Sequence, residues 1–218
     1  MRYRRSIVLG ASRQRLDKLV RERLQPGADT KAIDRRIWRL FGGRWCVMFT
    51  DLAGFSRNVA EYGIVHFLQN IYRSECLLAP VVERYDGLIL KFEGDSFLAV
   101  FRSPRRAVAA ALEMQRELAG FNRDLAPENQ VLLGVGLGYG PMLRIGDSDV
   151  FGAEVNAASK LGEDVAGPGD VLVTANVRAA VGKVRGSVFR KLAAAPPGAT
   201  AAYSLLRARS GGRQRQRR

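Results

Sequence analysis

The stretch KFEGDSFLAVF, residues 91–101, joins two apolar segments through a polar turn. GLILKF before the turn and FLAVF after it have the length and composition of β-strands, and Gly94 suits a tight reversal, so the pair predicts a β-hairpin. The hairpin nevertheless carries Lys91, Glu93 and Asp95, where a buried sheet would carry apolar residues. This polarity indicates that one edge of the sheet has a chemical role.

The segments around the hairpin predict the rest of the sheet. Residues 45–51, WCVMFTD, form a compact apolar strand, residues 54–62 break the pattern, and residues 64–85 have helical spacing. After the hairpin, a helix runs from Ser103 to Phe121, with the serine as its cap and a proline in its first turn. Residues 131–140, VLLGVGLGYG, follow as a strand. The order βαββαβ predicts an α+β fold with a ferredoxin-like core sheet, in which we expect the third strand between the first and the fourth.

This topology places two aspartates at one edge of the sheet. The helical crossover makes the first two strands parallel, so Asp51 at the end of the first strand lies at the same edge as the hairpin turn that carries Asp95. Taken alone, Asp51 is more often a helix cap and Asp95 a turn residue. Their predicted convergence, beside the small residues and backbone amides of TDLAGFS, favours a site for divalent metal and phosphate.

Further elements flank this core. Residues 1–40 contain two short helical patterns separated by QPGAD, which predict a helical N-terminal arm. A helix is predicted from Ala153 to Val165, and it places Asn156 and Lys160, four residues apart, on one face. The Ala/Pro-rich residues 191–206 predict a turn and an edge strand that close the domain.

The basic charge of the chain is confined to its two ends. The formal net charge is +14, of which residues 1–40 carry +8 and residues 207–218 carry +6, whereas residues 41–206 are neutral. A run such as RSGGRQRQRR attracts polyanions without specificity and is typical of a solvated, disordered tail. We therefore predict a neutral domain between a basic arm and a basic tail, with no specific nucleic-acid partner.

Apolar runs and cysteines indicate the compartment. No run approaches the roughly 18 apolar residues of a membrane helix, and the start of the chain has too short an apolar centre for a secretory signal. Cys46 and Cys76 lie in apolar segments, where we expect small buried residues and not a disulfide or a metal site. The prediction is a cytoplasmic protein without a transmembrane segment.

Three motifs together carry a family resemblance. FTDLAGFS, then LKFEGDSFLAVF, then DVFGAEVNAASKL occur in the order and frame in which the catalytic domain of class III nucleotidyl cyclases has them, and the resemblance extends over about residues 44–206. It implies a cyclase catalytic domain within residues 41–206. It also implies an adenylyl cyclase that converts ATP to 3′,5′-cyclic AMP and pyrophosphate by two-metal-assisted attack of the ribose 3′-hydroxyl on the α-phosphate, at the interface of a head-to-tail homodimer.

Carried over position by position, the resemblance assigns a metal and phosphate half-site. Asp51 and Asp95 would hold two divalent ions, Mg²⁺ or Mn²⁺, assisted by the carbonyl of Leu52. The amides that would cradle the β- and γ-phosphates are those of Ala53, Gly54, Phe55 and Ser56.

The resemblance also assigns a base and ribose half-site. Lys91 and Asp149 match the pair that reads adenine: an ammonium donates to a ring nitrogen, and a carboxylate accepts from the exocyclic amine where guanine has a carbonyl. Asn156 matches the residue that orients the ribose, and Lys160 stands where the family usually has an arginine at the transition-state phosphate. Lys191 is assigned to a further phosphate contact, with Arg190 an equal candidate.

Two other functions fit parts of the same pattern. Because lysine lacks the planar fork of arginine, Lys160 also fits a nucleotide-binding regulatory domain with little turnover. The βαββαβ order also serves RNA-binding modules, which need exposed aromatics on the central strands. The central strands here lack that interleaving of basic and aromatic residues, at Val47, Phe49, Phe97, Ala99 and Phe101. The N-terminal arm is a candidate docking element for a regulatory partner.

Overall fold

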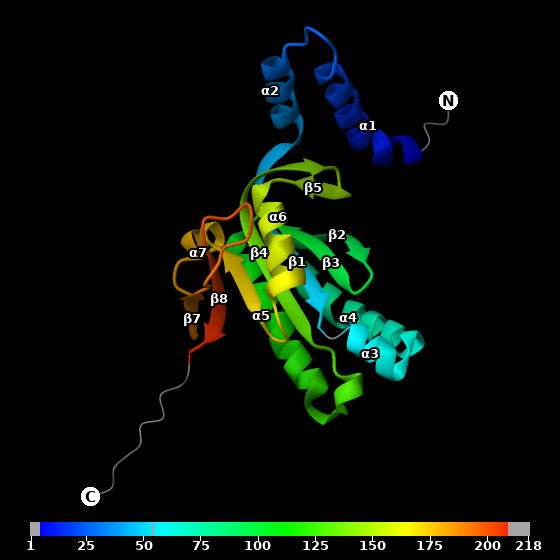
Figure 1. Ribbon diagram of the computed structural model, residues 1–218, viewed down its shortest axis with the longest axis vertical. Helices are drawn as coiled ribbons and strands as arrows, with labels where there is room; N and C mark the ends of the chain where they lie inside the picture. The colour runs from blue at the N-terminus through cyan, green and yellow to red at the C-terminus, as the bar shows by residue number, and fades with distance from the viewer. Residues whose placement is uncertain (1–4, 54, 209–218) are drawn as a thin grey trace, which may run out of the picture.

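The computed structural model describes the backbone of residues 5–53 and 55–208, and the side chains of residues 11–53 and 59–208 (Figure 1). Gly54 and nearly all of the predicted basic tail lie outside the described residues. In chain order the elements are α1 (Arg5–Arg23), α2 (Thr30–Phe41), β1 (Gly42–Leu52), α3 (Phe55–Tyr62), α4 (Ile64–Arg84), β2 (Gly87–Glu93), β3 (Ser96–Phe101), α5 (Pro104–Phe121), η1 (Asn122–Asp124), η2 (Pro127–Asn129), β4 (Leu133–Ile145), β5 (Asp149–Phe151), α6 (Ala153–Ser159), η3 (Lys160–Val165), β6 (Val171–Thr174), α7 (Ala175–Val181), β7 (Ser187–Lys191) and β8 (Ala202–Arg207).

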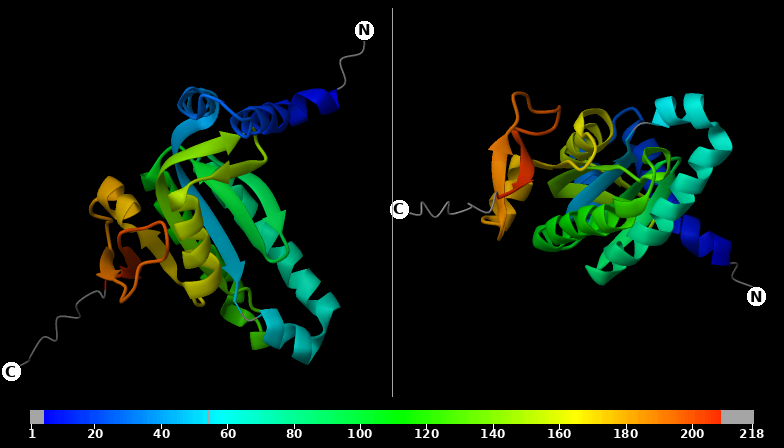
Figure 2. Two further views of the ribbon diagram at one scale, coloured as in Figure 1. Left: turned by 45° about the horizontal axis from the view of Figure 1, so that its top comes forward. Right: turned by 90° about the horizontal axis from the view of Figure 1, so that it is seen from below.

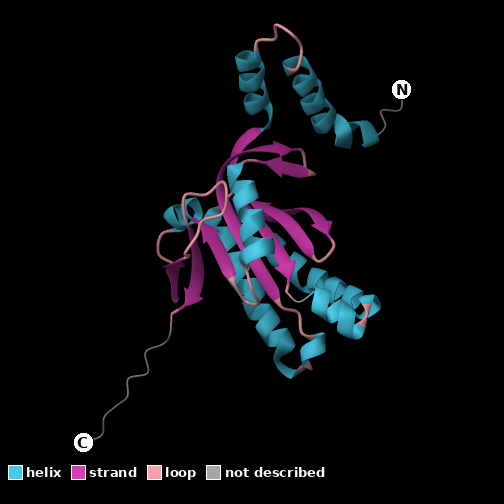
Figure 3. Cartoon of the chain, in the orientation of Figure 1, coloured by secondary structure: helices cyan, strands magenta, loops and turns pink. Residues whose placement is uncertain are grey.

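These strands form an eight-stranded sheet, and the α+β fold is confirmed. Its order is β2-β3-β1-β4-β6-β8-β7, with β5 paired to β4 outside this path (Figure 3). The expectation that the third strand lies between the first and the fourth is wrong, because β3 and β4 pair with opposite sides of β1. Since β1 and β2 are each antiparallel to β3, they run parallel, as predicted.

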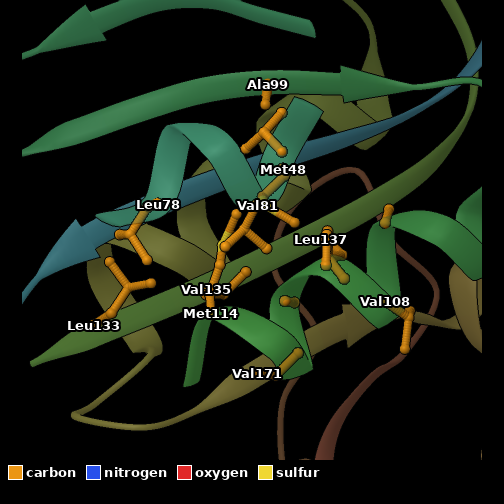
Figure 4. Close-up of a cluster of buried hydrophobic side chains, with 14 of the residues drawn as sticks. Met48, Leu78, Val81, Ala99, Val108, Met114, Leu133, Val135, Leu137 and Val171 are labelled. Atoms are coloured by element: carbon orange, nitrogen blue, oxygen red, sulfur yellow. The ribbon is translucent and has the colours of Figure 1, made fainter. Parts of the chain in front are cut away.

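Helices cover both faces of the sheet. On one face, α4, α5 and α7 bury apolar side chains against β1 and β4, and Figure 4 shows Leu78, Val81 and Met114 among them. On the other face, α6 packs Val155 and Ala158 against a second apolar cluster. Burial of these clusters is the main stabilising term of the fold. The same burial excludes the RNA-binding geometry, because the aromatic side chains of β1 and β3 are covered.

Alternate glycines on β4 let α6 approach the sheet closely. A Cβ atom at Gly136 would lie 2.3 Å from the carbonyl oxygen of Ala158, and one at Gly138 would lie 2.2 Å from that of Glu154. Any side chain at these positions would push α6 away from β4. The sequence GVGLGYG therefore encodes a strand with apolar side chains on one face and a bare surface for a helix on the other.

The two helical patterns of the arm form α1 and α2, which lie at the end of the sheet where β4 passes into β5 (Figure 1). Asp29 caps α2 by accepting a hydrogen bond from the amide of Ala32 at 2.9 Å. A small apolar cluster that includes Leu19, Phe41 and Ile145 joins the arm to the sheet.

Several local predictions are corrected by the structure. Residues 54–62 were expected to be a break, but Phe55–Tyr62 is the helix α3, and the break falls at Gly63, which has φ +85°. Strand β8 is not at the edge, because β7, which the sequence did not reveal, pairs outside it. Cys76 is exposed and not buried, because it lies on the face of α4 opposite Ser74 and Leu78.

Within the described part of the chain, none of the helices combines the length and the apolar character that crossing a membrane requires.

Candidate active site

Asp51 and Asp95 converge at one edge of the sheet, as the topology predicts. Asp51 is partly buried near the end of β1, and Asp95 lies in the turn between β2 and β3. The pKa of Asp51 is raised to about 6, first by burial and second by the negative charge of Asp95. Burial also raises the pKa of Asp95. Asp95 is therefore close enough for its negative charge to oppose the ionisation of Asp51.

This pair fits a divalent cation. Among the described side chains neither carboxylate has an ion-pair partner, and a cation would remove their mutual repulsion. No group of three or more His, Cys, Asp or Glu side chains that could hold a metal occurs within the described residues. Mg²⁺ suits such a site, because it binds through one or two carboxylates and completes its shell with water and substrate phosphates.

The segment after Asp51 supplies fewer free amides than the sequence suggested. The amide of Ala53 donates to the carbonyl oxygen of Leu132 at 2.8 Å, so it extends the pairing of β1 with β4 and is not free for phosphate. Helix α3 begins at Phe55, so the amides of Phe55 and Ser56 belong to its first turn, where amides have no partner within the helix. Gly54 and the side chains of Phe55 and Ser56 lie outside the described residues.

Two acidic residues that sequence reasoning missed also lie close enough to influence Asp51. Glu163 and Asp164 lie in η3, and both negative charges contribute to the raised pKa of Asp51. They come close because η3 crosses β1 tightly: a Cβ atom at Gly162 would lie 2.8 Å from the carbonyl oxygen of Phe49. Predicting this approach from sequence requires knowing that α6 continues into a π-helix.

Lys91 and Asp149, the predicted base-reading pair, are brought together. Lys91 aligns with Leu98, whose side chain belongs to the apolar cluster under α6, so Lys91 lies on the same face of the sheet as α6. Its Nζ lies 3.8 Å from Oδ1 of Asp149 on β5 and 2.8 Å from Oε1 of Glu93. The hydrogen bond that Lys91 donates to Glu93 is the first cause of the raised pKa of Lys91. Glu93, which the sequence motifs left as a structural residue of the hairpin, is thus a direct partner of Lys91.

Asn156 on α6 and Lys160 at the start of η3 are both exposed. Figure 1 shows α6 lying across the sheet. Nζ of Lys160 donates to Oδ2 of Asp164 at 2.6 Å, and this hydrogen bond raises the pKa of Lys160. Both side chains of the pair are more than half exposed, at 57% and 53%. The ion pair can therefore open without uncovering buried surface.

Glu154 anchors the start of α6, and no sequence motif identified it. The side chain is only 6% exposed. Its Oε2 accepts hydrogen bonds from the amide of Tyr139 at 3.0 Å and the hydroxyl of Thr174 at 2.6 Å, and its Oε1 accepts one from the side-chain amide of Asn176 at 2.6 Å. Three donors from β4, β6 and α7 thus hold the helix that carries Asn156.

Lys191 and Arg190 are not brought to the other site residues within one chain. Both lie exposed on β7, at the edge of the sheet opposite β2. Figure 1 shows β7 and the β2–β3 hairpin on opposite sides of the molecule.

Curated proteins are similar to this chain in sequence. A Rhizobium meliloti protein provisionally named adenylate cyclase 3 is 32% identical over 128 residues, which is 59% of this chain and 22% of that protein. The chain spans about a fifth of the length of the curated relatives it matches first.

Solved structures are also similar. An adenylate/guanylate cyclase/hydrolase from Silicibacter pomeroyi matches with 25% identity and a TM-score of 0.63, over 76% of this chain and 97% of that one. The adenylyl cyclase CyaB from P. aeruginosa has the same fold, with 18% identity and a TM-score of 0.62 over 78% of this chain and 96% of that one. The sequence model of the adenylate and guanylate cyclase catalytic domain matches residues 43–192. With that match over most of its length, on a sheet that brings Asp51 to Asp95 and Lys91 to Asp149, the chain belongs to the class III adenylate and guanylate cyclase catalytic domain family.

Proposed function

We propose that this chain is an adenylyl cyclase that converts ATP to 3′,5′-cyclic AMP and pyrophosphate. The observation that carries the choice of base is the approach of Lys91 Nζ to Asp149 Oδ1, at 3.8 Å. An ammonium and a carboxylate side by side match the ring nitrogen and exocyclic amine of adenine. Guanine would place a carbonyl oxygen against the carboxylate, and this repulsion disfavours GTP.

Glu93 has a defined part in this proposal. Its side chain is 60% exposed, whereas that of Asp149 is 27% exposed. Glu93 therefore has the freedom to leave Lys91 when a base arrives, while Asp149 stays in place. In the free protein both carboxylates keep the ammonium charged and oriented, as the raised pKa of Lys91 indicates.

Asp51 and Asp95 are proposed to hold two divalent ions, with the carbonyl of Leu52 as a further ligand. The ions would supply charge neutralisation for the triphosphate and activation of the ribose 3′-hydroxyl. The first-turn amides of α3, with Gly54, are the proposed donors to the phosphate oxygens. Asn156 orients the ribose, and Lys160 leaves Asp164 to contact the phosphate that is attacked.

We further propose that the active form is a homodimer with two composite sites. Domains of this family work as dimers that bind nucleotide. In one chain Lys191 lies across the sheet from Lys91, and the exposed face of Asn156 points to solvent. A second subunit that supplies Asn156 and Lys160 to the Asp51–Asp95 pair completes each site. Residues 41–206 form this catalytic unit, and residues 1–40 form an arm for a regulatory partner.

A direct assay tests the proposal. Purified protein with Mn²⁺ or Mg²⁺ is given ATP or GTP, and cyclic product is resolved from simple hydrolysis. We expect cyclic AMP from ATP, with GTP turned over more slowly. The variant Lys91→Glu with Asp149→Cys replaces both base-reading groups and is expected to raise the ratio of GTP to ATP turnover. An unchanged ratio would show that these residues do not read the base.

The ion pair between Lys160 and Asp164 favours one second function, a regulatory domain that binds nucleotide with little turnover. In that case Asp164 holds Lys160 away from the phosphate. Nucleotide binding without cyclic product in the same assay, with either metal, would select this function over the cyclase.

A further inference from the structure

A cavity of about 580 Å³ lies where α1 meets the sheet, at the end of β1 opposite Asp51. Ser12 and Arg15 of α1 form one wall, and Trp45 of β1, Arg102 after β3 and the β4–β5 turn form the others. Figure 2 shows α1 passing the sheet at this end. None of the proposed cyclase residues lines the cavity, so it is separate from the site described above.

The cavity is built around an indole ring that holds two guanidinium groups. Trp45 is 7% exposed. The Cζ atom of Arg102 lies 3.5 Å from the centroid of its ring, and that of Arg144 lies 4.5 Å from it. Stacking on the ring fixes the plane of a guanidinium group and leaves its edge open for hydrogen bonds. Arg144 already donates from Nε to the carbonyl oxygen of Gly146 at 2.9 Å and from one Nη to Asp147, which leaves three of its five N–H donors.

The charges in the cavity do not balance. Three arginines line it, Arg15, Arg102 and Arg144, together with a single acid, Asp147. Asp147 pairs with Arg144 and is itself 85% exposed. Among the described side chains, Arg15 and Arg102 have no ion-pair partner. Two uncompensated positive charges at one hollow repel each other, and a bound anion removes that repulsion.

We propose that this cavity binds a small phosphate-bearing anion, which bridges Arg15 of the arm to Arg102 and Arg144 of the sheet. Its volume lies within the range of small-molecule sites, about 300–1,000 Å³. Arginine edges bind phosphate oxygens in pairs, which favours phosphate over a halide or a single point charge.

The site is placed to link the arm to the base-reading pair. The β4–β5 turn contributes Gly146 and Asp147 to the cavity, and Asp149 follows two residues later on β5. An anion that draws Arg15 toward Arg144 therefore fixes the turn from which Asp149 projects. This regulatory consequence rests on the proposed cyclase function, whereas binding of the anion does not.

Fluorescence of Trp45 reports binding directly. The chain has two tryptophans, so Trp38→Phe leaves Trp45 as the only one. Inorganic pyrophosphate is the probe, and EDTA removes the divalent ions on which its binding at the Asp51–Asp95 pair would depend. We expect a saturable change in fluorescence. Arg102→Gln and Arg15→Gln, each in the Trp38→Phe background, are expected to weaken binding at least about tenfold, because each removes charge-assisted hydrogen bonds.

Arg123→Gln in the same background is the matched control, since Arg123 is exposed on η1 and does not line the cavity. It should bind pyrophosphate as the parent does. Equal weakening by all three substitutions would show a loss of general positive charge and overturn the site. Absence of a saturable change at millimolar pyrophosphate would also overturn it. So would a change produced only by phosphatidylcholine vesicles containing phosphatidic acid, which would assign these arginines to a membrane surface.

Discussion

Replacing Glu154 by glutamine is expected to destabilise the fold although the two side chains have nearly the same shape. Both oxygens of Glu154 accept hydrogen bonds, from Tyr139 and Thr174 at Oε2 and from Asn176 at Oε1. In glutamine one of these acceptors becomes an NH₂ group. Whichever way the amide turns, a donor then faces a donor in a site that is 6% exposed.

The magnitude follows from these contacts. Turning the nitrogen toward Asn176 places it against an NH₂ group. Turning it the other way loses the bond from the amide of Tyr139, because the Thr174 hydroxyl can turn to accept, so each orientation loses one hydrogen bond. A buried hydrogen bond to a charged group contributes about 1.5–3 kcal/mol, and the unpaired donor adds a desolvation cost of similar size. We expect a loss of about 2–4 kcal/mol. For a chain of this length, each kcal/mol lowers the melting temperature by roughly 2–4 °C, so the expected shift is about 5–15 °C.

Thermal unfolding followed by circular dichroism measures this shift at neutral pH. Glu83→Gln is the control, because Glu83 is exposed on α4 and the same chemical change there should leave the melting temperature within about 2 °C. A melting temperature of Glu154→Gln equal to that of the control would refute the reasoning, because it would mean that the three donors find other partners.

Four further predictions concern the catalytic edge. Asp51→Asn and Asp95→Asn should each abolish metal-dependent cyclisation while the circular dichroism spectrum stays unchanged, and near-normal turnover in either would disprove the metal assignment. Because the pKa of Asp51 is raised from 3.8 to about 6 on folding, the free energy of unfolding of the metal-free protein should fall as the pH rises from 4 to 7. The expected loss is about 1–2 kcal/mol after allowance for solvent screening. Denaturant titrations at each pH should show no such loss for Asp51→Asn. The same pH dependence of unfolding free energy in wild type and variant would contradict the raised pKa of Asp51. Lys160→Ala should lower kcat more than it changes KM, and Lys160→Arg should keep activity; equal rates for wild type and Lys160→Ala would make the lysine a surface residue. Mixing inactive Asp51→Ala with impaired Asn156→Ala should restore activity, because one site of each heterodimer is intact, and no gain after demonstrated subunit exchange would exclude a shared site.

The parts of the site that the sequence predicts are those fixed by strand topology. The approach of Asp95 to Asp51 follows from a parallel crossover and a hairpin, which leave one arrangement for a strand end and the next turn. The approach of Lys91 to Asp149 could not be derived in this way. It depends on the β4–β5 turn, whose course the sequence does not determine, and was available only from the family resemblance.

Features that depend on the close approach of two backbone segments were not predicted from the sequence. Glu154 has no motif, and its three partners come from segments that meet only because the glycines of β4 let α6 lie against the sheet. A buried glutamate is rare enough that its polarity beside Val155 and Ala157 was a usable signal. Short elements such as α7 and β7 carry too few residues for periodicity to separate helix from strand.

The charge of the Asp51–Asp95 edge affects how the proposed nucleotide substrate would enter it. Four carboxylates act there together, those of Asp51, Asp95, Glu163 and Asp164. Two ammonium groups interact with these acids, because Lys160 pairs with Asp164 and Lys91 interacts with the charge of Glu163. A triphosphate is strongly anionic, so an edge with this excess of negative charge repels it. Divalent ions on the Asp51–Asp95 pair, as proposed, would reverse that sign locally and allow the phosphates to approach. The proposed site is therefore expected to bind a nucleotide–metal complex and to bind the free nucleotide only weakly.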